Sequence, residues 1–81
     1  MDLLLLKNGK RLGVEVKRAD APALAPSMRI ALADLELDHL TVLYPGEKSY
    51  AIAERVTVVP FSVVAEGDLS ALFPLRRRKK L

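Results

Sequence analysis

The sequence predicts a small α/β domain: a mixed sheet that opens with an N-terminal β-hairpin, a right-handed crossover helix, and one or two short C-terminal helices. An Asn-Gly pair between two apolar runs, a central segment with helical spacing and later β-branched runs indicate this order. The 81 residues, 51% of them hydrophobic, suffice for one domain with a thin core. We expect that domain over residues 1–74 and a disordered basic tail over residues 75–81.

The hairpin is predicted by Asn8-Gly9. Both residues tolerate the positive φ angles of a type I′ turn, which joins two antiparallel strands through a two-residue loop. We expect the strands over residues 2–7 and 10–17, and apolar and polar residues alternate along the second strand. A two-residue loop also determines the register, which places Asp2 opposite Glu15 on one face of the sheet.

A helix is predicted from Ser27, as its N-cap, to about Leu37, after a proline-containing loop over residues 19–26. Its expected buried stripe has apolar residues at helical spacing, namely Met28, Ala31, Leu32 and Leu35. Residues 18–39 are long enough for a crossover, so the strands before and after the helix are expected to be parallel neighbours.

The second half of the chain contains two further expected strands. Residues 40–44 are apolar on both faces, and residues 56–59 are β-branched up to Pro60. Pro45-Gly46 is expected to occupy the central positions of a type II turn. Short helical turns are expected over residues 61–66 and 69–73.

Positive charge is concentrated in the tail. The formal net charge is +3, and five consecutive residues carry the excess: Arg76, Arg77, Arg78, Lys79 and Lys80. The other eight basic residues stand against ten acidic ones, so the rest of the chain carries −2. A surface that holds nucleic acid is usually basic across a face. We therefore expect any nucleic-acid contact to be weak, non-specific and made through the tail; the alternative is a solvated extension.

Composition also indicates a cellular setting. The chain has no cysteine, no apolar run of about 20 residues, and no basic segment before its first apolar run. We expect a cytoplasmic protein without a membrane partner. Glutamine is absent and asparagine occurs once, which is typical of thermophilic proteins.

The open end of the hairpin brings together Asp2, Glu15 and, two residues further along the same face, Lys17. Two carboxylates repel each other unless a lysine or a divalent cation compensates them, and carboxylates with water suit Mg²⁺. A metal with a nearby lysine can activate water and stabilise charge on a phosphoryl group. The alternative is an ordinary ion pair at a strand end, which contributes about 0–1 kcal/mol.

These residues resemble a known signature. Asp2, an apolar strand, a turn and Val14-Glu15-Val16-Lys17 resemble the D…ExK pattern of the PD-(D/E)XK nuclease-like superfamily. A longer pattern resembles the C-terminal domain of unknown function of prokaryotic AAA-type ATPases, over roughly residues 2–66. It comprises EVKRADAP at 15–22, SMRIAL at 27–32, LYPG at 43–46 and VVP at 58–60.

The resemblance implies a restriction-endonuclease-like core that lacks its first helix and strand, in a truncated, stand-alone fragment of the ATPase. It implies that Asp2 and Glu15 are metal ligands, that Lys17 is the catalytic lysine, and that Mg²⁺ is the cofactor. The expected function is a weak or vestigial Mg²⁺-dependent phosphodiester site. The alternative is a non-catalytic oligomerisation or partner-binding module.

Other residues are expected to be structural. His39 has no cysteine or second histidine to share a metal with, so we expect it at a helix end or on the surface. Tyr44 and Tyr50 are expected to pack rather than to stack on bases.

Assembly is predicted by the four consecutive leucines of the first strand. Leu3 and Leu5 are expected to enter the core together with the central helix, which leaves Leu4 and Leu6 uncovered on the other face. An apolar edge strand favours association. We therefore expect a homodimer built around the N-terminal hairpin, by edge pairing or by packing of the Leu4/Leu6 face.

Overall fold

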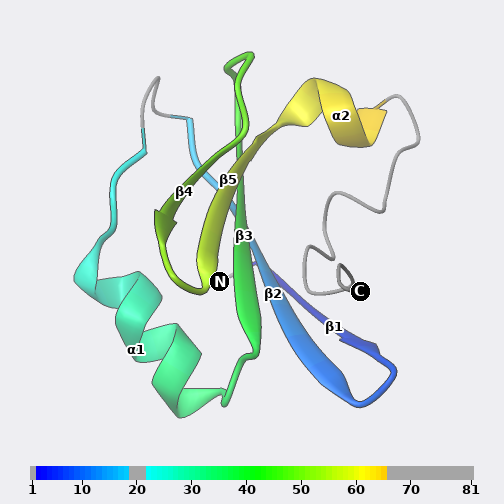
Figure 1. Ribbon diagram of the computed structural model, residues 1–81, viewed down its shortest axis with the longest axis vertical. Helices are drawn as coiled ribbons and strands as arrows, with labels where there is room; N and C mark the ends of the chain where they lie inside the picture. The colour runs from blue at the N-terminus through cyan, green and yellow to red at the C-terminus, as the bar shows by residue number, and fades with distance from the viewer. Residues whose placement is uncertain (1, 19–21, 66–81) are drawn as a thin grey trace, which may run out of the picture.

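The protein is a five-stranded mixed sheet with a helix on each face (Figure 1). The structure is a computed structural model that describes residues 2–18 and 22–65. The elements in chain order are β1 (Leu3–Lys7), β2 (Lys10–Val16), α1 (Pro26–Asp34), β3 (His39–Tyr44), β4 (Tyr50–Ala53), β5 (Val56–Pro60) and α2 (Phe61–Ala65). The predicted helical turn over residues 69–73 and the tail lie outside the described residues. No helix among the described residues has the length and apolar character needed to cross a membrane.

The strand order is β1-β2-β3-β5-β4, with a parallel centre and antiparallel edges. β3 pairs in parallel with both β2 and β5, which confirms the predicted parallel neighbours around the helix. β1 and β4 run antiparallel to β2 and β5. All six residues of β3 are buried, as expected for a central strand covered on both faces.

The N-terminal hairpin has the predicted turn and register. Asn8 and Gly9 both have positive φ angles, 53° and 79°, as a type I′ turn requires. The pairing runs from Lys7 opposite Lys10 to Leu3 opposite Val14, without a shift. The turn chemistry alone therefore determines which side chains of the hairpin share a face.

The main hydrophobic core lies between α1 and the sheet. It contains the buried side chains of Met28, Leu32, Leu37, Leu40, Val42, Tyr44, Val56 and Val58. These residues come from α1, the segment after it, β3 and β5, so α1 covers the half of the sheet away from the hairpin. Neither β1 nor β2 contributes a residue to this cluster.

A smaller core lies on the opposite face, beneath α2. Buried Val14, Leu43 and Val59 pack there with half-buried Leu5 and with three residues of α2: Phe61, Val63 and Val64. The expectation that Leu3 and Leu5 enter the core with the central helix is therefore wrong, and Leu3 is 50% exposed. Leu5 pairs with Leu12 on the α2 face, whereas α1 packs on the other face, where Gly13 pairs with Leu40.

The start of α1 differs from the prediction by two residues. Pro26 opens the helix, and the preceding Ala25 is the N-cap, with extended backbone and no side-chain capping bond. Proline favours the first helical turn because its missing N–H would lack a helical partner there, and it drives the residue before it into extended geometry. Ser27 is therefore inside the helix and is not its N-cap.

The end of α1 comes three residues before the predicted Leu37. The Leu37 N–H bonds the Leu32 carbonyl at 2.9 Å, and the Glu36 N–H bonds the Ala33 carbonyl at 3.3 Å. With Glu36 at a φ of 53°, these bonds form a Schellman motif. The chain turns there, so Leu37 is buried in the main core and Leu35 is 36% exposed.

Strand β4 was not predicted. Its four residues include two alanines, and β propensity is weak in so short a run. It forms because the Glu54-Arg55 turn folds it back onto β5, with a register shift between Ala51 and Ala53. The strand predicted over residues 56–59 and the helical turn predicted to follow it are confirmed: β5 ends at Pro60 and α2 follows at once.

The β3–β4 loop is organised by Tyr44, and Gly46 is required there for space. The Tyr44 hydroxyl accepts a hydrogen bond from the Lys48 N–H at 3.2 Å and donates one to the Lys48 carbonyl at 2.7 Å. A Cβ at Gly46 would overlap the Tyr44 ring and hydroxyl. Gly46 does not have a positive φ, so the predicted type II turn is wrong.

We predict that Gly46→Ala destabilises the fold by about 1–3 kcal/mol, because the new methyl group forces the Tyr44 ring away from its two hydrogen bonds. Urea denaturation measures the change. The control is Glu47→Ala in the same exposed loop, which is expected to change stability by less than about 0.5 kcal/mol. Equal stabilities for the two variants would contradict the role of Gly46.

Candidate metal and phosphodiester site

Asp2 lies beside the carboxyl end of β2. Its N–H donates to the Val14 carbonyl oxygen at 3.0 Å, and its Oδ2 accepts a hydrogen bond from the Val16 N–H at 2.7 Å. These contacts attach Asp2 to β2 on both sides of Glu15, through its main chain at Val14 and through its carboxylate at Val16. One of the two Asp2 carboxylate oxygens is thus already bound to the main chain.

Glu15 and Lys17 form an ion pair at the end of the same strand. Lys17 Nζ lies 3.0 Å from Glu15 Oε2, and the two side chains are 39% and 10% exposed. The Lys17 N–H also donates to the Leu43 carbonyl at 2.8 Å, which attaches the main chain of Lys17 to β3. This main-chain hydrogen bond therefore holds Lys17 where its ammonium group reaches the Glu15 carboxylate.

Glu15 lies on the α1 face of the sheet, because it pairs with Val42, which belongs to the main core beneath α1. The ion pair keeps the Lys17 ammonium group beside the Glu15 carboxylate. The Asp2 carboxylate lies at the end of β2, where it bonds the Val16 N–H. The structure thus brings together, at one end of the hairpin, the three residues that the sequence singled out.

The donor set is small but of the right kind for a hard cation. Carboxylate oxygens are the ligands that Mg²⁺ prefers, and Mg²⁺ often uses only one or two of them while keeping water and phosphate oxygens. Within residues 2–18 and 22–65, no cluster of three or more His, Cys, Asp or Glu side chains suitable for a metal is present. Each carboxylate has one oxygen already engaged, Asp2 Oδ2 by the Val16 N–H and Glu15 Oε2 by the Lys17 ammonium group.

The same contacts have a structural interpretation. The Asp2 carboxylate satisfies a main-chain N–H at the end of β2. The Glu15–Lys17 pair is partly exposed on its lysine side, and pairs of this kind contribute about 0–1 kcal/mol. The geometry is therefore compatible with both alternatives that the sequence left open.

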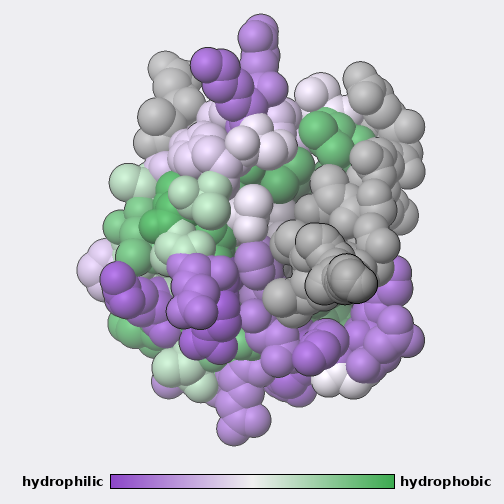
Figure 2. All heavy atoms as spheres, in the orientation of Figure 1, coloured by the Kyte–Doolittle hydropathy of each residue, from purple (hydrophilic) through white to green (hydrophobic). Residues whose placement is uncertain are grey.

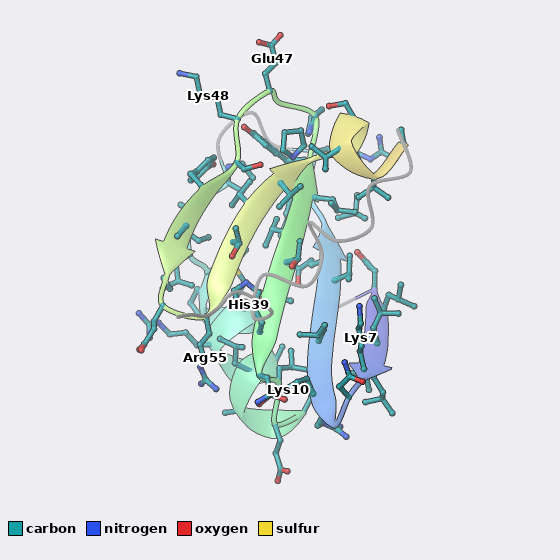
Figure 3. All side chains as sticks on the ribbon, turned by 45° about the vertical axis from the view of Figure 1, so that its right-hand side comes forward. Lys7, Lys10, His39, Glu47, Lys48 and Arg55 are labelled. Atoms are coloured by element: carbon teal, nitrogen blue, oxygen red, sulfur yellow. The ribbon has the colours of Figure 1, made fainter. Side chains whose placement is uncertain are left out.

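His39 is buried, and the expectation of a surface position is wrong. It is the first residue of β3, pairs with Leu12 and is 5% exposed. Its Nε2 lies 2.6 Å from Thr57 Oγ1, while Nδ1 is buried without a hydrogen-bond partner. Figure 3 shows His39 on β3 within the sheet, away from the loop that carries Glu47 and Lys48. The sequence gives little indication of the His39–Thr57 contact, because this contact depends on how β3 aligns with β5.

Burial lowers the pKa of His39, and the positive charge of Arg55 lowers that pKa further. Arg55 is held nearby by a hydrogen bond from Nη1 to the Leu37 carbonyl at 3.1 Å. The neutral imidazole is therefore favoured in the folded chain.

The two tyrosines pack as expected. Their ring centroids are 5.9 Å apart in an edge-to-face arrangement, and both contact the main core. The Tyr50 hydroxyl donates to the Pro22 carbonyl at 3.1 Å. Tyr44 is buried and its hydroxyl is hydrogen-bonded to the Lys48 main chain, so its ring is not exposed for stacking on bases.

Hydrophilic residues lie at both ends of the sheet. In the view of Figure 2 a small group projects from the β3–β4 loop, and most of the others lie toward the end formed by the β1–β2 and β4–β5 turns. Lys7 and Lys10 at the hairpin turn belong to this region (Figure 3). The basic residues of the hairpin turn thus lie at the opposite end of β2 from Glu15 and Lys17.

The chain is similar to two mycobacterial proteins. An uncharacterised protein of Mycobacterium tuberculosis and one of Mycobacterium bovis are each 36% identical to it over 76 residues. The matched segment covers 93% of this chain and 17% of each relative. No protein-family model matches the chain, and no solved structure matches it.

We predict that the fold loses stability as the pH falls below about 6.5, the ordinary pKa of histidine. The folded state disfavours protonated His39, so the unfolded chain takes up the proton first and its population rises. His39 is the single histidine of the chain, so urea midpoints measured between about pH 5 and 7.5 isolate it from the carboxylates.

The control is His39→Asn, which keeps a polar group near Thr57 and cannot titrate in this range. Its urea midpoint is expected to vary much less with pH over the same interval. A variant that keeps the full dependence on pH would show that another group is responsible.

Proposed function

We propose that this chain is a nuclease-like domain with a weak Mg²⁺-dependent phosphodiester site formed by Asp2, Glu15 and Lys17. The observation that carries the proposal is the Glu15–Lys17 ion pair of 3.0 Å, formed where β2 ends and where the Asp2 carboxylate bonds the Val16 N–H. A lysine two residues after a carboxylate on a strand shares its face, and the residue before β1 adds a second carboxylate at the end of β2.

Each residue has a distinct role in the proposed site. Asp2 and Glu15 would hold the cation, and a bound Mg²⁺ would polarise a phosphoryl oxygen and lower the pKa of its water. Lys17 lies close enough to Glu15 to neutralise it while the substrate is absent. Its partly exposed ammonium group can then turn to a phosphate oxygen and stabilise the negative charge that develops there.

The order of the elements supports the proposal. An acidic residue before β1, a Glu-x-Lys at the end of β2, a crossover helix and a parallel strand follow one another as in the resemblance to nuclease-like domains. The segment matched in the mycobacterial relatives is 17% of their length, which agrees with a domain carried within longer proteins. Membership of an ATPase C-terminal domain family remains part of this proposal.

A second candidate function is a non-catalytic module that binds another protein strand. The observation that favours it is the exposure of three leucines on the outermost strand, β1. In this case Asp2, Glu15 and Lys17 serve only to close the end of the hairpin.

We predict that Mg²⁺ or Mn²⁺ binds with a dissociation constant on the order of millimolar, as expected for two carboxylates that leave most ligand positions to water. Glu15→Gln is expected to weaken binding by roughly tenfold or more, since it removes a charged ligand. Isothermal titration measures the affinity, and Mg²⁺-dependent cleavage of DNA measures the activity, which Lys17→Met is also expected to abolish.

The matched control is Glu54→Gln. Glu54 is an exposed carboxylate in the β4–β5 turn, at the opposite end of the sheet from the end of β2. Circular dichroism of each variant verifies the fold. Metal binding that Glu15→Gln leaves unchanged would reject the metal site, and cleavage that persists in Lys17→Met would reject the role of the lysine.

Nucleic-acid contact is proposed to depend on the basic run over residues 76–80, which lies outside the described residues. Deletion of residues 75–81 is expected to abolish binding to duplex DNA. With five phosphate contacts at most, log affinity should fall with log salt at a slope no steeper than about −4.5. Fluorescence anisotropy of a labelled duplex provides the measurement. Binding that survives the deletion would place the contacts on the sheet.

A further inference from the structure

The outer edge of β1 is open and apolar. Within the part of the chain that the structure describes, β1 pairs only with β2, and no strand covers its other side. Leu3, Leu4 and Leu6 are 50%, 37% and 69% exposed. Figure 3 shows β1 at the outside of the sheet, with side chains projecting beyond it. An open, leucine-rich edge is a template for pairing with another strand.

The free hydrogen-bonding groups of this edge are predictable from the turn. In a hairpin with a two-residue loop, the residues flanking the loop exchange main-chain hydrogen bonds, and the pattern then alternates. Leu5 and Lys7 therefore direct their N–H and C=O groups toward β2. Leu4 and Leu6 direct theirs outward, where no strand of residues 2–18 and 22–65 pairs with them.

The other edge strand is less suited to docking. β4 has four residues, and its register shifts between Ala51 and Ala53. A bulge and a short length are the features by which proteins protect an edge from pairing. β1 has five residues in continuous register and no such protection.

We infer that the occupant of the β1 edge is a second copy of this chain, paired antiparallel with Leu5 opposite Leu5 of the second copy. The inference rests on the second candidate function and is independent of the metal site. In this register Leu4 lies opposite Leu6 of the second copy, so the outward-directed groups of both strands meet as hydrogen-bonded pairs. The edge is therefore complementary to itself.

Charge favours this register over one centred on Lys7. Centred on Leu5, the pairing sets each Lys7 opposite Leu3 of the second copy, at the two far ends of the joined strands. A register centred on Lys7 would set the two ammonium groups directly opposite each other, which is unfavourable for like charges. Registers shifted toward the turn also lose pairs of leucines.

The pairing covers both faces of the edge. A two-fold axis perpendicular to the sheet keeps the α1 faces of the two copies on one side. Leu4 and Leu6 of each copy then meet on that face, and Leu3 and Leu5 meet on the other. Such a contact is at the small end for specific interfaces, roughly 1,200 Å² in total, so we expect dissociation at micromolar concentration.

Sedimentation of the full chain over a range of concentrations tests the inference. The wild-type chain is expected to pass from monomer to dimer, and Leu4→Lys with Leu6→Lys is expected to remain monomeric. The matched control is Ile30→Lys with Leu35→Lys, which adds the same charge at exposed apolar positions of α1 and its C-cap. This control is expected to dimerise like the wild type.

Disulfide trapping tests the register. The chain has no cysteine, so single substitutions report cleanly. Leu5→Cys is expected to form a covalent dimer on mild oxidation, because directly opposed residues lie within disulfide range. Leu3→Cys alone is expected to remain uncrosslinked, whereas a mixture of Leu3→Cys and Lys7→Cys is expected to form the mixed dimer. Crosslinking of Leu3→Cys to itself in preference would overturn the register.

The remaining outcomes separate the inference from the function on which it rests. A wild-type chain that stays monomeric at every concentration rejects the second copy as the occupant of the edge. A dimer that Leu4→Lys with Leu6→Lys leaves intact rejects the β1 edge as a contact surface altogether.

Discussion

The parallel pairing of β2 with β3 is the constraint on which the rest of the structure depends. Asp38 connects the two strands at the start of this pairing. Its Oδ2 accepts a hydrogen bond from the Arg11 N–H, and its own N–H donates one to the Arg11 carbonyl, both at 2.7 Å. At the end of the pairing the Lys17 N–H bonds the Leu43 carbonyl. Parallel neighbours require a crossover, so the chain must pass over one face of the sheet. α1 takes that path and brings its apolar side over β3 and β5.

The candidate site is a consequence of this pairing. Because β2 ends in line with β3, Glu15 is largely buried beside Val42, and Lys17 is held within reach of its carboxylate. Asp2 completes the hairpin by binding the Val16 N–H. The residues that would hold a cation thus also lie where the pairing of the strands ends. One Asp2 oxygen already accepts a hydrogen bond from the Val16 N–H. This shared use is consistent with a weak site.

The position of the two helices also explains the open edge. α1 lies over β3 and β5, and α2 packs on the other face against Val14, Leu43 and Val59. Of the β1 leucines, Leu5 alone reaches this second core. Over residues 2–18 and 22–65, neither helix covers the α1 face of β1. The exposed leucines are apolar surface that this part of one copy leaves uncovered.

The hairpin, its register and the parallel strands around the helix were predictable from the sequence, because turn chemistry, side-chain alternation and crossover length act locally. The sequence also predicted that Glu15 and Lys17 are neighbours, which the ion pair confirms. Only the tertiary structure decided which face α1 covers, that β4 pairs with β5, and that His39 is buried against Thr57. The end of α1 also depends on tertiary packing, because Leu37 rather than Leu35 is buried in the core. These features depend on contacts between segments far apart in the chain, and periodicity within one segment does not encode which partner covers it.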